Sequence, residues 1–379
     1  TYKELKGTNI EVNSSDPSNP VEGQVWFNST SNVLKGQRPN LSGAWSTGPS
    51  INTARKQSGI NGTQTSTLVA GGNPGGSPAA TGNTESFNGT SFTEVNDLNT
   101  ARRILKSIGA DNTSALAFGG YTAEAVTESW NGTNWTEVND LNTGRGFIAG
   151  AGSTTAGLAM GGGPPYRAQT ESWDGSSWTE VNDLNSARYL SSGGAGSQTS
   201  AIVAGGGSPA TNKTETWNGT NWTEVNDLNT ARNHLATFGG YSDNTSVLVA
   251  AGENDSGTKQ TLTEEWNGTN WTEVADLSTA RHYTGGAGTT SSGNVIAGEA
   301  APGVTAATEE WNLNILVGAW STGGSINDGR STSGAAGTSN TTGIIFGGLP
   351  PTTANTESYN GSNWTEVNNL NTARNSLAG

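Results

Sequence analysis

The sequence of 379 residues contains no cysteine. Disulfides, thiolate zinc sites and cysteine nucleophiles are therefore excluded together. Apolar runs of about eighteen residues are also missing, so the sequence predicts no transmembrane helix and no membrane insertion. The opening residues TYKELKGTNI lack the charged-then-apolar order of a signal peptide, so secretion by that route is not predicted.

Basic residues are few. The chain has 18 Lys and Arg against 32 Asp and Glu, which gives a net charge of −14. Most of the arginines fall at one repeated position instead of gathering in a patch. Because phosphate binding needs clustered positive charge, we expect no nucleic acid partner.

Glycine and tryptophan, by contrast, are abundant, at 55 and 13 residues, and tryptophan recurs at a regular spacing. One aromatic residue stands before each copy of TEV or ST, at intervals of 43 to 49 residues, and an arginine follows it ten positions later. The pairs are Trp45 and Arg55, Phe92 and Arg102, Trp135 and Arg145, Trp178 and Arg188, Trp222 and Arg232, Trp271 and Arg281, Trp320 and Arg330, and Trp364 and Arg374. Such a period indicates a repeat architecture.

Four short strands are predicted in each unit. A Gly/Ala/Ser-rich segment follows the arginine, and an apolar run ending in small residues, such as SALAFGG, comes next. TESWNG and NWTEVNDL complete the unit, and Asn131-Gly132 between them predicts a two-residue type I′ turn that places Glu128 opposite Trp135. Four strands in every 43 to 49 residues are typical of a β-propeller blade, so we predict an all-β fold.

Over residues 45–379 these motifs resemble the Kelch repeat family. The matching features are the Gly-Gly doublet that closes the second strand, two tryptophans five residues apart and the arginine downstream. The fifth and sixth units depart from the pattern with AAG and AGE, and one hairpin is longer between Trp311 and Trp320. The resemblance implies that the small-residue segment is the innermost strand and that the tryptophan rings fill the gaps between blades. The structural blade residues that it implies include Trp130, Trp135, Arg145, Trp173, Trp178, Arg188, Trp217, Trp222 and Arg232.

The number of blades is less sharply defined by the repeats. Seven doublet strands and seven TES-type hairpins favour seven blades, with the first arm, AWSTGPSINTAR, closing the ring as the outer strand of the last blade. Six or eight blades are the alternatives to seven. GAWSTGGSIN at 318–327 nearly repeats GAWSTGPSIN at 43–52, and it marks the start of a second array if the first ring has six blades. We therefore predict a small β-module over residues 1–40 and a propeller over 41–379.

The head of the chain does not follow the repeat. Its stretch EGQVWFNSTSNVLKG resembles segments of bacteriophage tail-fibre and virion structural proteins, of the marine phage type. The resemblance implies a virion protein, assembled in the bacterial cytoplasm and displayed at the particle surface. It also implies that the first module attaches to other virion proteins or mediates homo-oligomerisation, with a trimer as the usual form of fibres.

Several repeated polar residues have simple structural interpretations. The Asn-X-Thr triplets at Asn131 and Asn134 match glycosylation sites, but they surround one tight turn. The repeated arginine is expected to hold backbone carbonyls or a carboxylate such as Asp140, Asp183 or Asp227 of the VNDL segment.

The acidic and histidine residues do not predict a reaction centre. The acid pair of each unit, such as Glu128 and Glu137, is copied in every blade, whereas an active site breaks the symmetry of its scaffold. His234 and His282 are two ligands at unlike positions, which makes a poor metal site. We therefore predict no catalytic residues, no metal and no cofactor.

The loops between the doublet and the TES motif vary while their surroundings are copied. Variable loops on one face of a repeat array usually carry specificity. The binding candidates there are Tyr121, Tyr166, Arg167, Glu253, Asn254 and Asp255.

Three functions are compatible with these features. The first, which we favour, is a non-enzymatic fibre or appendage subunit that adheres to a host-surface glycan or protein. The second is a capsid-decoration or tail scaffold protein without a ligand. The third is a glycan-degrading enzyme on the same fold.

Overall fold

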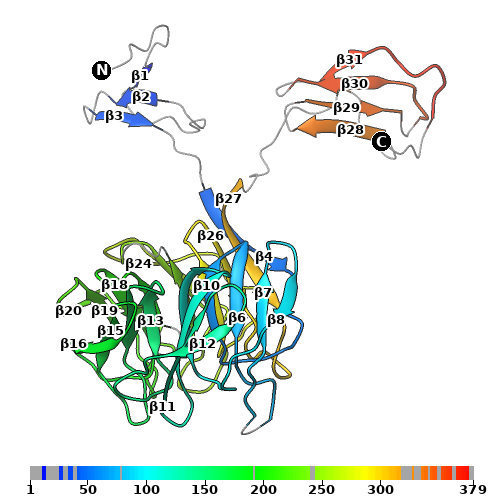
Figure 1. The fold of residues 1–379 in the computed structure, drawn as a ribbon. Coiled ribbons are helices and arrows are strands. Elements are labelled where there is room, and N and C mark those ends of the chain that lie inside the picture. The colour runs from blue at the N-terminus through cyan, green and yellow to red at the C-terminus, as the bar shows by residue number, and fades with distance from the viewer. Residues whose placement is uncertain are drawn as a thin grey trace. The chain divides into compact units, whose positions relative to one another are not determined.

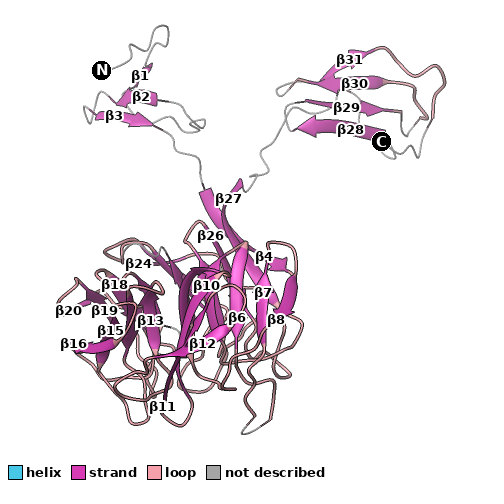
Figure 2. Cartoon of the chain, viewed as in Figure 1, coloured by secondary structure: helices cyan, strands magenta, loops and turns pink. Residues whose placement is uncertain are grey.

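The computed structural model describes residues 11–13, 25–28, 33–36, 41–76, 79–190, 193–239, 244–316, 327, 334–339, 342–347, 351–360 and 364–374. The chain forms two compact units, Thr1–Leu316 and Val317–Gly379. The described residues form strands and loops, with no helix among them (Figure 2). Accordingly, none of the described residues belongs to a helix that could span a bilayer.

Six four-stranded antiparallel sheets, the blades, make up the larger part of the first unit (Figure 1). The inner strands are β5 (Gly59–Thr63), β9 (Lys106–Asp111), β13 (Ala149–Gly152), β17 (Gly194–Gly196), β21 (Ala236–Gly239) and β25 (Gly285–Gly288). The second strands are β6 (Ser66–Ala70), β10 (Ser114–Gly120), β14 (Gly157–Met160), β18 (Ala201–Ala204), β22 (Val247–Ala250) and β26 (Ser292–Ile296). The third strands are β7 (Thr84–Phe87), β11 (Glu124–Trp130), β15 (Thr170–Trp173), β19 (Thr214–Trp217), β23 (Thr263–Trp266) and β27 (Thr308–Leu316). The outer strands are β8 (Phe92–Val95), β12 (Trp135–Val138), β16 (Trp178–Val181), β20 (Trp222–Val225), β24 (Trp271–Glu273) and β4 (Leu41–Gly48).

The inner strands neighbour one another in chain order, and β25 returns to β5, so the blades close into a β-propeller. We number the blades from 1, which contains β5, to 6, which contains β25. Small residues dominate the inner strands because six strands converge there and leave little room for side chains. The predicted all-β propeller fold is confirmed.

The ring of described blades has six members, not the seven that we favoured. Strand β4 supplies the outer strand of blade 6 and pairs with β27 in a register that places Trp45 opposite Trp311 (Figure 1). The first arm thus closes the ring as expected, but one blade earlier. The seventh doublet and hairpin belong to the second unit, as the near-repeat at 318–327 allowed.

Two further sheets do not belong to the ring of blades. Strands β1 (Glu11–Asn13), β2 (Val25–Asn28) and β3 (Val33–Gly36) form one sheet, in which β1 runs parallel to β2 and β3 antiparallel to it. In the second unit, β28 (Gly334–Ser339), β29 (Thr342–Phe346), β30 (Thr356–Tyr359) and β31 (Trp364–Val367) form one blade-like sheet. Ile344 of this sheet is 37% exposed, whereas Ile202, the equivalent residue of blade 4, is 1% exposed.

The outer hairpin differs from the predicted type I′ turn. Trp130 pairs with Trp135, and Glu128 pairs with Glu137 instead of Trp135. Asn131 and Asn134 face each other across a tip of Gly132 and Thr133, and Gly132 is its left-handed residue, with φ 90°. The Asn131 side chain causes the shift, because its Oδ1 accepts hydrogen bonds from the backbone N–H groups of Thr133 and Asn134.

The second aromatic residue of each hairpin, which is tryptophan in every blade except blade 1, packs between blades. Trp178 of blade 3 donates its indole N–H to Thr127 Oγ1 of blade 2 at 3.2 Å, and its ring contacts Phe118. The first tryptophan, Trp173, donates to the backbone oxygen of Thr154 in its own blade. One indole therefore joins neighbouring blades and the other secures the blade's own inner turn.

A buried carboxylate fixes each connection between blades. Between blades 2 and 3, Asn142 donates its backbone and side-chain N–H groups to Glu171 Oε2 at 2.7 and 2.9 Å. Arg145 donates to Glu171 Oε1 at 2.5 Å, and both side chains are at most 1% exposed. The other pairs are Arg55 with Glu85, Arg102 with Glu128, Arg188 with Glu215, Arg232 with Glu264 and Arg281 with Glu309.

Our expectation that the arginine binds the aspartate of the VNDL segment was wrong. Asp140 of the VNDL segment instead accepts the backbone N–H of Thr127 at 2.9 Å. Asp183 and Asp227 accept the backbone N–H groups of Thr170 and Thr214 in the same way. The arginine reaches the glutamate because Glu128 points to the buried face of the hairpin, whereas Asp140 lies at its exposed end.

We predict that Glu171→Gln lowers the free energy of unfolding by about 3–5 kcal/mol, because Arg145 is then a buried charge without its counter-charge. Chemical denaturation measures the change. Glu180→Gln is the matched control: Glu180 lies directly opposite Glu171 but is exposed, so its effect stays within about 0.5 kcal/mol. Equal effects of the two substitutions would contradict the assigned role of the buried pair.

Candidate functional site

Two sets of loops meet at one end of the ring, which we name the loop face. One set consists of the connectors, by which we mean the segments between each arginine and the inner strand that follows it. The other set consists of the variable loops between the second and third strands. Hydrogen bonds between adjacent blades join the two sets of loops. In each of them, a backbone N–H at the end of the second strand or just after it donates to the backbone oxygen of the next blade's arginine. The donors are Gly72, Gly120, Gly162, Gly206, Gly252 and Gly298, the acceptors are Arg102, Arg145, Arg188, Arg232, Arg281 and Arg55, and the distances are 2.9 to 3.2 Å.

Glycine is required where these bonds form. At Gly206, for example, φ is 93° and a Cβ would lie 2.1 Å from the backbone oxygen of Tyr189. The fifth and sixth units, AAG and AGE, keep glycine at this donor position and place Ala251 and Ala297 at the left-handed position before it. The departures from the doublet therefore preserve the backbone that the bond needs.

A second set of backbone hydrogen bonds links successive connectors around the axis, and five of the connectors contain a strained residue. The second residue after the arginine is left-handed in five of the connectors, and these residues are Gln57, Ile104, Phe147, His234 and Tyr283, with φ between 51° and 62°. Four of these residues donate their N–H groups to the connector of the preceding blade, as in Ile104 N to Gln57 O at 2.8 Å and Tyr283 N to His234 O at 3.0 Å. Non-glycine residues rarely adopt this conformation, and least of all a β-branched one such as Ile104.

Side chains of the connectors, together with Tyr166 of a variable loop, form an aromatic cluster, which consists of Phe147, Tyr166, Tyr189, His234, His282 and Tyr283. Tyr189 stacks on Phe147 at a centroid distance of 4.7 Å, and Tyr166 meets Tyr189 edge-on at 4.4 Å. His234 lies 3.9 Å from Tyr283. The cluster thus runs as a continuous strip of aromatic rings across several blades of the loop face.

Four charged residues border the two histidines. We call them the charged cluster, and they are Lys56, Glu253, Lys259 and Glu299. Glu253 Oε2 lies 2.6 Å from His282 Nδ1, and Glu299 takes Lys56 and Lys259 as ion-pair partners. Burial by itself raises the pKa of Glu299, but hydrogen bonds from the two lysines and their charge hold that pKa at about 2. Burial and the charges of Glu253 and Glu299 raise the pKa of Tyr283 to about 12.

An open groove lies beside the aromatic cluster, between blades 3 and 4. Its volume is about 210 Å³, and its lining includes Tyr166, Ser186, Pro209, Thr211 and Lys213. Tyr166 is 43% exposed and donates its hydroxyl to the backbone oxygen of Ser208. An exposed aromatic ring beside a cation and hydroxyl groups can bind a ligand that has both apolar and polar faces.

The structure separates the six predicted binding residues into different roles. Tyr166 lines the groove, and Asp255 accepts the backbone N–H of Ala210 from the same loop that Tyr166 contacts. Glu253 belongs to the charged cluster. Asn254 stabilises its own loop, since its Oδ1 accepts the N–H groups of Ser256 and Thr258.

The other two predicted residues lie in other loops. Tyr121 is 41% exposed and covers the guanidinium of Arg103 at 4.1 Å from its ring centroid. Arg167 donates to Gln169 Oε1 at 3.1 Å, in the loop that carries Tyr166.

The connector residues are the part of the site that we did not predict. Their segment was interpreted only as an inner strand, and His234 and His282 as ordinary members of it. A signal was present: the residues after each invariant arginine read KQ, RI, GF, YL, NH and HY, so they vary as much as the loops do. Among the described residues, no three His, Cys, Asp or Glu side chains are grouped to hold a metal.

Comparison with known proteins supports the fold alone. No protein-family model matches the chain, and no curated protein matches it. Among solved structures, YjhT is similar with a TM-score of 0.50 and 12% sequence identity, over 69% of this chain and 96% of that one. At this identity the likeness supports a β-propeller and gives no information on a ligand.

The buried histidine His234 predicts a loss of stability in acid. Burial, with the charges of His282 and Lys56, lowers its pKa from 6.5 to about 3. The unfolded chain therefore takes up a proton below pH 6.5 that the folded chain takes up only near pH 3, so stability falls as the pH falls between these values. From about pH 7 to about pH 4 this group lowers the free energy of unfolding by roughly 3 kcal/mol.

Denaturation at both pH values, in the wild type and in His234→Asn, measures this contribution. Asparagine tolerates the left-handed backbone at this position and does not titrate. The variant should lack the His234 part of the pH dependence. A variant that loses as much stability in acid as the wild type would show that His234 is not the responsible group.

Proposed function

We propose that this chain is a non-enzymatic structural subunit of a bacteriophage virion, a fibre or appendage protein with Kelch-like blades that adheres to the host surface. The observation that carries the adhesive role is the groove at Tyr166, where an exposed aromatic ring stands beside Lys213 and the hydroxyl groups of Ser186 and Thr211. The virion setting is supported by the stretch EGQVWFNSTSNVLKG near the start of the chain.

A surface glycan suits this groove better than an apolar ligand does. Sugar rings present C–H groups that pack on an aromatic face, and hydroxyls that need polar partners at the edge. The groove is open and shallow, so one contact is weak. Many copies on one particle multiply such contacts into firm attachment.

The rest of the proposal follows from the same reasoning. The first module, with its β1–β3 sheet, attaches the chain to other virion proteins or joins copies of it into a homo-oligomer, for which a trimer is the expected form. The protein is then located at the surface of the particle, and the loop face is its outward, host-directed surface.

We predict that the full chain binds host-surface polysaccharide on a glycan array, and that Tyr166→Ala weakens this binding about tenfold, because the stacking face is lost. Tyr121→Ala is the matched control, since Tyr121 is equally exposed at 41% but lies in another loop over Arg103. Binding that Tyr121→Ala weakens and Tyr166→Ala does not would move the site to blade 2.

Two other outcomes would replace the proposal. Absence of glycan binding, together with location of the protein on the particle by cryo-electron microscopy, would favour a scaffold or capsid-decoration protein. Shortened polysaccharide after incubation would favour a degrading enzyme. Finding the protein in a cell envelope instead of a virion would overturn the virion assignment.

A further inference from the structure

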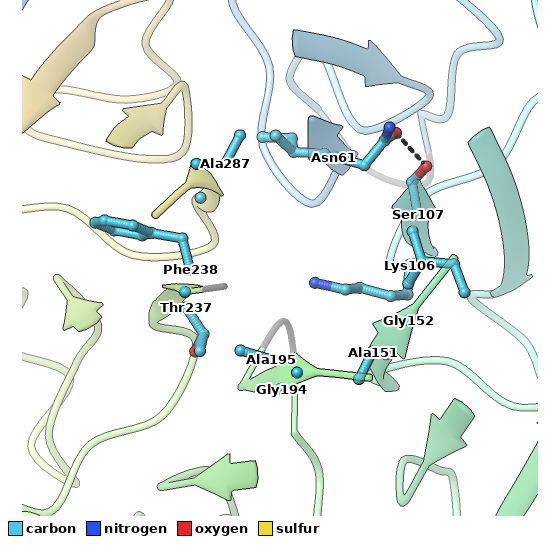
Figure 3. Close-up of a pocket in the computed structure, with 17 residues that line it drawn as sticks. Asn61, Lys106, Ser107, Ala151, Gly152, Gly194, Ala195, Thr237, Phe238 and Ala287 are labelled. Atoms are coloured by element: carbon cyan, nitrogen blue, oxygen red, sulfur yellow. Dashed lines mark hydrogen bonds between the residues drawn. The ribbon is translucent and has the colours of Figure 1, made fainter. Parts of the chain in front are cut away.

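A small cavity lies on the axis of the ring, where the inner strands of all six blades meet (Figure 3). Its lining is mostly glycine, alanine and apolar side chains, with Asn61, Lys106, Ser107 and Thr237 as the polar ones. The volume of the cavity is about 40 Å³, which is room for about three water molecules. One charged side chain, Lys106, extends into this space (Figure 3).

Lys106 breaks the symmetry of the ring. It pairs with Phe118, the residue before the doublet, and the same register identifies its equivalents in the other blades. These equivalents, whose second-strand partners also precede the doublet, are Gly59, Ala149, Gly193, Ala236 and Gly285. A lysine therefore stands where every other blade has glycine or alanine.

The neighbouring blade leaves room for the lysine stem. A Cβ at Gly150 would lie 2.8 Å from Lys106 Cγ, so any larger residue at that position would collide with the side chain. Lys106 is only 6% exposed. The ring thus directs this side chain toward its axis instead of letting it extend to solvent.

The amino group of Lys106 has no counter-charge in the cavity. None of the ion pairs and hydrogen bonds between described residues involves its Nζ, and none of the other lining residues titrates. Burial lowers its pKa from 10.5 to about 8. At neutral pH the group is therefore a protonated cation in an apolar space, which is costly unless an anion accompanies it.

A second polar group in the cavity also lacks a partner. The hydroxyl of Thr237 is buried and makes no hydrogen bond to any described residue. Asn61 and Ser107, by contrast, satisfy each other through a hydrogen bond of 2.7 Å (Figure 3). Among the side chains of the lining, Lys106 and Thr237 thus supply the hydrogen-bond donors that have no partner among the described residues.

We propose that the axial cavity is a binding site for one small anion, chloride or a carboxylate no larger than acetate, with Lys106 as its cationic donor and Thr237 as its hydroxyl donor. The bound anion neutralises the buried lysine and bridges the inner strands of blades 2 and 5, so it stabilises the ring. The site is separate from the loop-face groove and does not depend on the proposed adhesion. The net charge of −14 opposes anions at long range, so the affinity comes from the local lysine charge.

The test compares the full-length wild type with Lys106→Met, which keeps the stem and removes the charge. Lys106→Ala is a second variant that the ring accepts, because Ala149 and Ala236 occupy the equivalent positions. Arg374→Met removes an exposed cation that belongs to neither the axial cavity nor the loop-face groove, and it is the control. The Tm of each protein is measured with sodium chloride, formate or acetate at constant ionic strength set by a bulky sulfonate, and calorimetry measures binding directly.

We expect the Tm of the wild type and of Arg374→Met to rise with at least one of these anions, and the Tm of both Lys106 variants to stay constant. Without a small anion, Lys106→Met should be more stable than the wild type, because it lacks the uncompensated cation. Anion affinity should fall at least tenfold from about pH 6 to about pH 10, as Lys106 loses its proton. The comparison among chloride, formate and acetate identifies the anion.

Two results would overturn the proposal. One is a wild-type Tm that does not respond to any of the three anions up to about 100 mM, which would mean that the cavity holds only water. The other is an anion response that both Lys106 variants retain in full, which would place the anion elsewhere.

Discussion

The ring depends on one buried interaction, the glutamate carboxylate on the third strand of each blade. Glu171 shows what this group does: one oxygen accepts two N–H groups of Asn142, and the other accepts the guanidinium of Arg145. The connector from blade 2 is thus fixed on blade 3 before it turns into the inner strand. A buried charge needs such full compensation, and this explains why the Asn, the Arg and the Glu recur together in the sequence.

Once the connector is fixed, the geometry of the loop face follows. The arginine is buried, its carbonyl faces the preceding blade, and the glycine after that blade's second strand donates to it. The next residues must bend sharply to enter the inner strand, which explains left-handed residues as bulky as Ile104 and Phe147. The backbone is therefore determined, while the side chains that it presents are free to differ. Most of the aromatic cluster is built from these free positions, whereas Tyr166 and the three charged residues Glu253, Lys259 and Glu299 come from the variable loops.

The sequence predicted the strands and the tryptophan spacing well, because period and hydrophobicity report directly on them. It could not distinguish Glu128 from Asp140 as the arginine's partner, since both acids recur in every unit and only the hairpin register buries one of them. That register itself depended on Asn131. Asn-Gly is typical of a type I′ turn, but the same asparagine can cap the turn with its side chain, and the choice between the two shifts the pairing. Blade number failed for a related reason: counting motifs does not show that β4, from the start of the chain, takes the outer position in blade 6.

Symmetry gives a way to separate construction from function in such a ring. A residue that is present in every blade answers to a demand that every blade shares, and the glutamates and arginines meet such a demand. A residue that is costly and present in one blade only has no such explanation. Lys106 is the clearest case, because five equivalent positions show that glycine or alanine is sufficient to build the ring there. Its burial therefore needs a local cause, and an anion beside it in the axial cavity would supply one.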